Sequence, residues 1–404
     1  LYDQGVILVF SYIGYKSEEV QVADQTVIDV GLTFLAEDLE EIVVVGYGVQ
    51  KKKLSTGATV NVGAEEIDNK HSLRIEQAIQ GLTPGVSITA NSGQPGEPLK
   101  VRIRGVGTVG DSDPLYVVDG MPTDDIRYLN PADLESVDIL KDAASAAIYG
   151  ARAANGVILI TTKKGQEGQM RVSYDGYYGI QNTPKKIDML NGEEYCMIMN
   201  EAAVNSGDDS LFTQEEIDAI GKGTNWMDYL FKKNVPTQSH VVSVSGATER
   251  SVYSSSLSYF SQEGIIGSEN KSQFQRISFR LNTEHKLYKD IVKVGENLVY
   301  SHSKVRGVGV GNAYDNTVRN FVNASPIYPV YSDTTEDGFG RSSKFPLDVN
   351  PVAAMHYNDF TIDKFDKLLG NIYTEIEFIK GLSFTSRLGI DLSFKRTNEY
   401  IYQL

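Results

Sequence analysis

The chain has 404 residues, a hydrophobic fraction of 41 % and a formal net charge of −15. No run approaches the roughly 18–20 apolar residues of a membrane-spanning helix, which excludes a helical membrane protein and leaves β-barrels open, because their strands alternate. The negative charge argues against nucleic-acid binding, and the single cysteine, Cys196, excludes an intrachain disulfide and a cysteine-based zinc site.

The first 35 residues contain three short strand candidates, at 6–10, 20–22 and 27–30. The chain begins at Leu1 without a charged segment followed by an apolar one, so either a signal peptide has been removed or the start lies inside a longer gene. The strand candidate at 6–10 lies so close to the first residue that a start inside a longer gene is favoured. Because three strands are too few for an independent domain, we expect residues 1–35 to be the tail of a small β-sandwich.

An acidic stretch at 36–41 then leads into a short β-branched strand, Ile42 to Val45, which is followed by glycines and lysines. Such an isolated strand is a candidate for adding itself to the sheet edge of a partner. An ordinary internal edge strand is an equally open interpretation of the pattern.

Residues 61–165 have a mixed α/β pattern and form a domain large enough for its own core. A helix is predicted from Leu73 to Leu82, with Ser72 as N-cap and Gly81 at its end. Asn130-Pro131 predicts another helix start, and 143–149 predicts a small-residue helix closed by Gly150. Strands are predicted at 99–103, 114–118, 136–140 and 156–162.

From residue 168 onward the chain contains long strands in which apolar and polar residues alternate, seven candidates in all. One candidate sets a polar row against an apolar row: Arg276, Ser278, Arg280 and Asn282 against Phe274, Ile277, Phe279 and Leu281. The connections between strands are alternately short and long, as in outer-membrane barrels. Because seven strands do not close a barrel and an open edge is not viable in lipid, we expect the barrel to continue beyond Leu404.

Residues for enzymatic chemistry do not stand out. The glycines 105, 107 and 110 match a dinucleotide fingerprint, but a strand rather than a helix follows them. The five histidines are scattered, no nucleophile elbow occurs, and the aspartates at 111, 113, 124 and 125 lack EF-hand spacing. We expect no enzyme activity, no cofactor and no metal.

Six stretches in the middle of the chain occur in a characteristic order: LEEIVVVGYGVQ (39–50), AIQGLTPGV (78–86), VRIRG (101–105), PLYVVDGMP (114–122), LNPADLESVDILKD (129–142) and AIYGARAANGVILITTKKG (147–165). Together they resemble the plug of TonB-dependent receptors, specifically the SusC-like branch of Bacteroidota. FSYIGY (10–15) is similar to the end of the carboxypeptidase-regulatory-like sandwich that precedes the plug.

The resemblance implies roles for particular residues. The Ton box, which TonB captures as an added strand, would be Glu41, Ile42, Val43, Val44 and Val45. Ion pairs that hold the plug shut would involve Arg102, Arg104, Glu135 and Arg152, although charged groups without a gating role are commoner.

The implied fold is a mixed α/β plug followed by the first strands of an antiparallel transmembrane β-barrel, preceded by the end of a small β-sandwich. The implied domains are the sandwich tail (1–35), the Ton box and linker (36–50), the plug (51–166) and the incomplete barrel (167–404). The implied location is the outer membrane of a Gram-negative cell, in contact with its lipid, with the plug and N-terminal region facing the periplasm.

The implied function is TonB-dependent import of a large nutrient, with glycan oligosaccharides as the leading cargo and peptides as the next. The implied partners are TonB with its inner-membrane complex and a SusD-like lipoprotein lid, which would dock on the long loops at 181–237 and 304–364. A passive porin-like channel and a soluble enzyme with a β-rich C-terminal half are the rival hypotheses. The plug and the Ton-box-like strand argue against the first, and the sorted loop lengths argue against the second.

Overall fold

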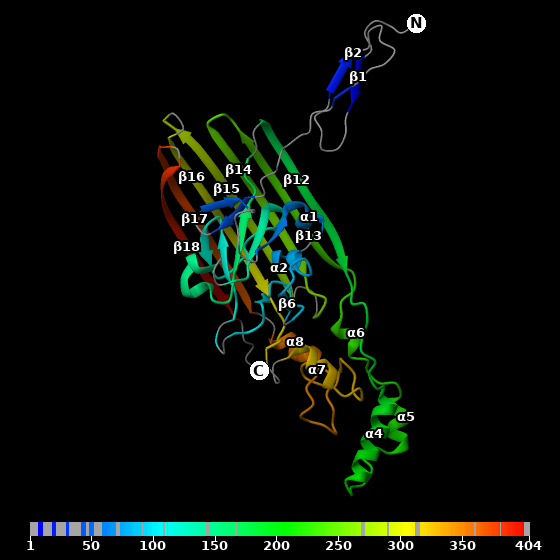
Figure 1. Cartoon of the computed structure of the whole chain (residues 1–404). Coiled ribbons are helices and arrows are strands. Elements are labelled where there is room, and N and C mark those ends of the chain that lie inside the picture. Colours follow the sequence, from blue (N-terminus) through cyan, green and yellow to red (C-terminus); the bar gives the residue numbers. More distant parts are fainter. Residues whose placement is uncertain are drawn as a thin grey trace, which may run out of the picture.

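The computed structural model describes residues 7–10, 18–21, 30–31, 42–45, 48–51, 59–69, 73–90, 92–107, 110, 112–142, 146–165, 168–267, 271–288, 291–311, 316–358, 361–379 and 381–399. Two antiparallel strand pairs precede the main body: β1 (Ile7–Phe10) with β2 (Glu18–Gln21), and β3 (Ile42–Val45) with β4 (Gly48–Lys51). The third strand predicted at 27–30 lies almost entirely outside the described residues. Figure 1 shows β1 and β2 well away from the rest of the chain.

The next part is a small α/β domain, called the plug below, built on a sheet with the order β5-β10-β11-β8-β9. Only β11 and β8 pair in parallel; the other neighbours are antiparallel. The strands are β5 (Thr59–Gly63), β8 (Leu115–Val118), β9 (Met121–Thr123), β10 (Leu134–Leu140) and β11 (Val157–Thr162). A separate hairpin joins β6 (Val86–Ala90) to β7 (Leu99–Ile103).

Short helices cover this sheet: α1 (Ala64–Asn69), α2 (Ile75–Ile79), η2 (Pro131–Asp133) and η3 (Ala147–Ala153). The four strands predicted at 99–103, 114–118, 136–140 and 156–162 are confirmed within two residues. The central strands β10 and β11 supply the most deeply buried residues of the core, Val137, Ile139, Ile158 and Ile160. These strands could be predicted from the sequence because they are continuous β-branched runs that are buried on both faces.

Two of the predicted helices differ from the observed ones. The helix predicted from Leu73 begins only at Ile75, with Arg74 at its N-cap and no side-chain capping bond; Ser72 lies outside the described residues. The helix predicted at 143–149 is observed as a 3₁₀ turn that begins at Ala147, and Gly150, with a φ of 68° and a ψ of −156°, breaks the helical geometry as predicted before a second turn ends at Ala153. Residues 143–145 lie outside the described residues. A local propensity for helix is weak here, and packing against the sheet decides the outcome.

The rest of the described chain forms a seven-stranded antiparallel sheet in sequence order, called the wall below. Its strands are β12 (Gly168–Gln181), β13 (Val235–Ala247), β14 (Ser251–Glu263), β15 (Gln273–Leu287), β16 (Val292–Arg306), β17 (Ile362–Ile379) and β18 (Leu382–Asn398). All seven strand predictions are confirmed. Figure 1 shows the wall curving around the plug, which lies against its concave face.

The wall is apolar on the side that faces away from the plug. Exposed on that side are Val242, Leu257, Ile277, Phe279, Tyr300 and Ile372, whereas the plug-facing side buries Thr237, Ser239, Ser254, Ser256, Ser258, Arg276, Ser278, Arg280, Asn282, Ser301 and Asn371. This polarity is the inverse of that in a water-soluble sheet, and it suits lipid outside and polar contacts inside. One residue was assigned wrongly: Phe274 shares the parity of Arg276 and lies buried on the plug-facing side.

Short and long connections lie at opposite ends of the wall. The turns after β13, β15 and β17 are at one end, and the helices of the long connections are at the other, as Figure 1 shows. These helices are α4 (Gly192–Asn205), α5 (Gln214–Ile220), α6 (Met227–Leu230), α7 (Thr317–Asn323) and α8 (Pro351–Asn358). In the described part of the chain, none of the helices has the length and apolarity required to cross a bilayer.

Gly156 gives a test of the plug packing, because it precedes β11 with a φ of +93°. A Cβ at this position would lie 2.7 Å from Ile103 Cδ1 and 3.2 Å from the carbonyl oxygen of Leu140. We expect Gly156→Ala to lower the free energy of plug unfolding by about 1–3 kcal/mol through backbone strain and overlap. Hydrogen exchange of the β11 amides would measure it. Gly93→Ala, where a Cβ would meet nothing within 4 Å, is the control and should stay within about 0.5 kcal/mol.

Candidate functional site at the contact between plug and wall

The plug is fastened to the wall by a row of polar side chains on β15, called the β15 row: Arg276, Ser278, Arg280 and Asn282. Alternation along the strand points all four toward the plug. Arg276 Nη1 donates to the carbonyl oxygens of Arg127 and Leu129, each at 2.6 Å, and Ser278 Oγ donates to that of Tyr128 at 3.0 Å. Arg276 and Ser278 therefore bind the plug backbone rather than plug side chains.

Arg280 forms the buried ion pair of this contact. Its Nε lies 3.2 Å from Asp133 Oδ1, and the two side chains are 3 % and 7 % exposed. The Nε–H group is not aligned as a hydrogen-bond donor, so charge attraction dominates that contact. The other guanidinium nitrogens donate to the carbonyl oxygen of Lys163 at 2.6 Å and to Ser254 Oγ at 3.0 Å. Asp133, Lys163 and Ser254 together replace the water that the Arg280 guanidinium loses on burial.

Local plug structure positions the acceptors for Arg280. Asn130 Oδ1 accepts a hydrogen bond from the backbone N–H of Ala132 at 3.0 Å and so caps η2, whose last residue is Asp133. The backbone N–H of Lys163 donates to the carbonyl oxygen of Asp133 at 2.8 Å, which ties together the two plug segments that Arg280 contacts. The predicted role of Asn130-Pro131 as a helix start is confirmed.

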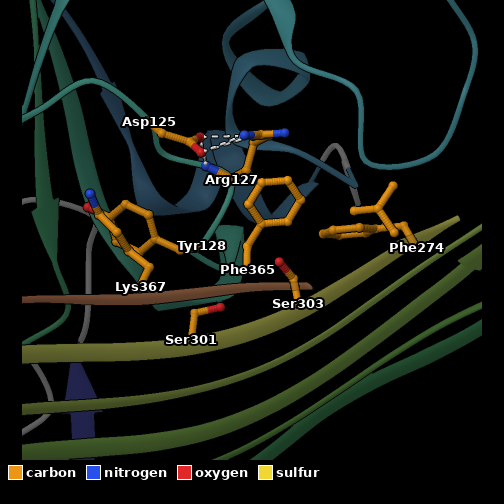
Figure 2. Close-up of a pocket in the computed structure, with 9 residues that line it drawn as sticks. Asp125, Arg127, Tyr128, Phe274, Ser301, Ser303, Phe365 and Lys367 are labelled. Carbon is orange, nitrogen blue, oxygen red and sulfur yellow. Dashed lines mark hydrogen bonds and ion pairs between the residues drawn. The ribbon is translucent and has the colours of Figure 1, made fainter. Parts of the chain in front are cut away.

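A second contact lies nearby, above β16 and β17. Figure 2 shows Arg127 facing Asp125 on one side and the ring of Phe365 on the other. Arg127 donates to Asp125 through Nε and Nη2 at 2.9–3.1 Å, and its guanidinium lies 5.5 Å from the Phe365 ring centre. Burial by itself would lower the pKa of Arg127, but the hydrogen bonds to Asp125 raise it above the ordinary value. The cavity that these residues line has a volume of about 30 Å³, the space of roughly one water.

Arg276 also borders a larger cavity of about 110 Å³, between Asn130 on the plug and Ser239 on the wall. Within the described part of the chain, Arg276 Nε and Nη2 and Asn130 Nδ2 have no hydrogen-bond partner. Three buried donors without acceptors require water, and the cavity has room for roughly three molecules. This part of the contact is therefore polar and suited to hydration, whereas Val299 and Leu369 of the wall pack into the hydrophobic core of the plug nearby.

Several known proteins are similar to this chain. The family described as TonB-dependent Receptor Plug Domain matches residues 51–157. TonB-dependent receptor P26 of Formosa agariphila is 36 % identical over 380 residues, which cover 91 % of this chain and 36 % of the relative. TonB-dependent receptor SusC of Bacteroides thetaiotaomicron is 34 % identical over 368 residues, covering 88 % and 35 %. The chain is thus similar, over about nine tenths of its length, to SusC-like TonB-dependent receptors.

A solved structure shows the same similarity. The RagAB peptide importer in its 'open-open' state superposes with a TM-score of 0.73 at 30 % identity, covering 88 % of this chain and 43 % of that one. This SusC-like chain thus spans a little over a third of the length of the curated relatives it matches. These relatives are receptors and transporters rather than enzymes, in agreement with the expectation from the sequence.

The four charged residues that the family resemblance proposed for gating make none of the contacts described above with the β15 row. Arg152 pairs with Asp124 at 3.1 Å, but both side chains are largely exposed. Arg102 and Glu135 are exposed, and Glu135 borders a cleft between plug and wall. Arg104 takes a φ of 56° and, after burial, is the second cause that lowers the pKa of Lys141. Of these four, within the described ranges, only Arg152 has an ion-pair partner, and the gating role stays a prediction.

The segment predicted as the Ton box falls only in part within the described residues. Residues 42–45 form β3, paired with β4, while Glu41 lies outside the described residues. The residues that the sequence did not single out are Arg276 and Arg280. Their signal was present, because two arginines four residues apart on the polar face of a strand need buried acceptors. Nothing in the sequence identifies those acceptors as the backbone of residues 127–129 and 163.

Arg280 gives a test of the plug–wall contact in the full-length receptor. Arg280→Met should lower the free energy of opening at residues 131–135 by about 3–5 kcal/mol, because it leaves Asp133 buried and unpaired. Hydrogen exchange of those amides would measure the change, and adding Asp133→Asn should recover most of it. Arg152→Met, which removes an exposed pair, should cost at most about 1 kcal/mol. An equal effect of the two arginine variants would contradict the role given to Arg280.

Proposed function

We propose that this chain is part of an importer that uses TonB to draw a large polar nutrient across the outer membrane. The observation that carries the proposal is a folded plug seated on the polar face of a sheet whose other face is apolar. An apolar outer face fits contact with lipid, and a plug joined to the wall by polar contacts fits a pore that opens under force. A passive channel needs neither a plug nor an energy-coupled segment.

The orientation in the membrane is part of the same proposal. Outer-membrane barrels have short turns on the periplasmic side and long loops outside. The turns after β13, β15 and β17 therefore face the periplasm, as do the plug and the N-terminal strands. Figure 1 shows β1 and β2 on the side of these short turns. In the proposed orientation they therefore extend toward the inner membrane.

The opposite end of the wall fits a SusD-like lipoprotein as the lid. The helices of the two long connections gather there, and two of them carry complete capping boxes: Asn191 with Glu194 before α4, and Thr213 with Glu216 before α5. Trp226 anchors α6 through its indole N–H, which donates to the carbonyl oxygen of Ser325 in the other connection at 2.9 Å. Two loops held together in this way form a preformed surface rather than two independent chains.

Glycan oligosaccharides are the cargo we propose first, following the resemblance to the SusC-like branch. Peptides are the second candidate, favoured by the superposition on RagAB, whose structure is described as that of a peptide importer. Both cargoes are polar and would pass along the serine-lined, plug-facing side of β14.

The proposed Ton box has one free edge. Because two residues separate β3 from β4, Val45 and Gly48 form the closing hydrogen-bonded pair, and the pairs alternate from there. The backbone N–H groups of Val45 and Val43 then point to β4, whereas those of Val44 and Ile42 point away. A strand of TonB can pair with that second row without displacing β4.

Val44→Pro should abolish uptake, since proline removes an N–H from the free row. Val43→Pro, which removes an N–H directed at β4, is the matched control and should retain uptake. The measurement is accumulation of labelled oligosaccharides and labelled peptides, in parallel, by cells that carry the full-length gene and its neighbouring lipoprotein. The class that accumulates identifies the cargo. Uptake unchanged by Val44→Pro would favour the passive channel.

A further inference from the structure

Three basic side chains form a line across the wall, called the basic row below: Lys304 on β16, Lys364 on β17 and Arg396 on β18. The strand register places Lys304 directly opposite Lys364, and Lys364 directly opposite Arg396. Side chains directly opposite in an antiparallel pair share a face, with Cβ atoms about 4.5–5.5 Å apart. Three positive charges therefore lie side by side, at the end of the wall that carries the helices of the long connections (Figure 1).

The basic row is on the side of the wall that faces away from the plug. Along a strand, residues an even number of positions apart share a face. Lys304 therefore shares the face of Tyr300, which is 43 % exposed on that side. Lys364 shares the face of Ile372, which is 56 % exposed, and the strand pairing carries Arg396 to the same side.

An apolar band begins next to the basic row and runs toward the short turns. On β18, the outward positions from Phe394 back to Phe384 are all apolar except Gly-free Ser386. This stretch spans about 33 Å along the strand at a rise of about 3.3 Å per residue. A strand tilt of about 35–45° reduces its height to about 25 Å, which is the height of the apolar band of an outer-membrane barrel. Arg396 therefore lies just outside the hydrocarbon, at the level of the lipid headgroups.

The basic row lacks the carboxylates that accompany the other opposed lysines of the wall. Lys286 and Lys293 are also directly opposite each other, but Glu284 and Glu375 lie 3.7 and 3.6 Å from Lys293 Nζ. Among the described residues, no side chain of the basic row forms an ion pair or donates a hydrogen bond. Like charges that face each other without a counterion destabilise strand pairing. An anion bound between the three side chains would remove this repulsion.

One acidic side chain, Asp366, lies on the same face, one step along β17 into the apolar band. It is directly opposite His302, and its Oδ1 accepts hydrogen bonds from His302 Nδ1 and from Tyr300 Oη, each at 2.8 Å. Its charge acts on Arg396 without forming an ion pair in the part of the chain that the structure describes. Asp366 thus has partners of its own, and the three cations leave a net positive charge at the headgroup level.

A phosphate monoester matches the chemistry of the basic row. Its three terminal oxygens can accept hydrogen bonds from two lysines and an arginine at once, and the guanidinium can bind two of them in parallel. Leu392 and Phe394, which are 45 % and 64 % exposed next to the row, offer apolar surface that free phosphate cannot use. The neighbouring surface therefore favours a phosphate that carries acyl chains.

We propose that the basic row binds the phosphate group of a glycolipid in the outer leaflet, with the acyl chains of that lipid lying against the apolar band. Basic side chains at the membrane surface are the usual recognition element for anionic headgroups. The inference rests on the orientation in the outer membrane given under the proposed function, and it is independent of the cargo and of the Ton box. It assigns a lipid-binding site to the outer face of β16, β17 and β18.

Lipid retention by the full-length receptor tests the proposal. The row variant combines three substitutions: Lys304→Gln, Lys364→Gln and Arg396→Gln. The control variant removes three exposed lysines of the connection between β12 and β13: Lys185→Gln, Lys222→Gln and Lys233→Gln. Native mass spectrometry of each detergent-purified protein, mixed with purified lipopolysaccharide, measures the lipid that stays bound. We expect the row variant to bind at least tenfold more weakly than the wild type and the control to stay within twofold. Equal binding by the row variant would overturn the proposal.

Three further probes distinguish the possible sources of the phosphate. Lipopolysaccharide stripped of its lipid A phosphates should bind at least tenfold more weakly, and equal binding would contradict phosphate recognition. Phosphatidylglycerol should also bind at least tenfold more weakly, because its phosphodiester has two terminal oxygens and one charge. Inorganic phosphate in excess should leave the lipid bound, because it cannot use the apolar band. Equal binding of phosphatidylglycerol, or displacement by inorganic phosphate, would overturn the assignment to a glycolipid.

Single substitutions cover the case in which the row variant fails to fold. Lys364→Glu places a carboxylate between two cations and should weaken lipid binding at least tenfold. Lys364→Arg keeps the charge and should stay within threefold of the wild type. Equal binding by these two variants would contradict the role of the basic row.

The orientation is tested separately with Leu347→Cys, at a position that is 94 % exposed in the connection between β16 and β17. A membrane-impermeant maleimide should label this thiol on intact cells that lack the neighbouring lipoprotein. Absence of labelling would overturn the orientation and, with it, a site in the outer leaflet. Labelling together with unchanged lipid binding by the row variant would overturn the lipid site alone, so the two failures are distinguishable.

Discussion

Two arginines buried on one face of a strand impose the constraint on which the rest of the arrangement depends. A guanidinium removed from water needs acceptors, and Arg276 and Arg280 find theirs in the backbone of the plug and in Asp133. The wall can thus be polar inside only because the plug supplies these partners. The plug, in turn, is placed by the same bonds.

The division between an apolar core and a polar interface explains how a tightly folded plug can still be moved. Buried residues such as Val137 and Ile158 hold the plug together, and their exposure would be costly. Between plug and wall, the polar contacts of the β15 row lie beside apolar contacts of Val299 and Leu369, and cavities next to Arg276 have room for water. Hydrogen bonds exchanged for water cost little net free energy, so the hydrogen-bonded part of this interface separates more easily than the apolar core unfolds.

Sorting of features along the axis of the wall connects the fold to its proposed task. The short turns, the N-terminal strands and the entry of the chain into β5 belong to one end, and the helices α4 to α8 belong to the other. An importer needs such a polarity, because energy arrives on one side and cargo on the other.

The sequence by itself determined the elements whose pattern is strong and local. Period-two alternation over long strands identified the wall, β-branched runs identified β10 and β11, and Asn130-Pro131 identified the start of η2. Where the signal was short, as at residues 73–74, the prediction of the helix start went wrong because packing on the sheet overrode propensity. Phe274 was placed on the wrong face by one residue, which in a strand reverses its direction.

The site was decided only by tertiary structure. The sequence contains Arg276 and Arg280, but their partners are carbonyl oxygens more than a hundred residues away, and every residue carries a carbonyl oxygen. No pattern of side chains can therefore mark such an acceptor. A carbonyl oxygen becomes a specific acceptor for these arginines only when the fold places η2 and the end of β11 side by side, facing β15. The pattern of side chains along each strand can be read from the sequence alone. The pairing of a buried arginine with backbone carbonyl groups exists only after both segments have folded and packed together.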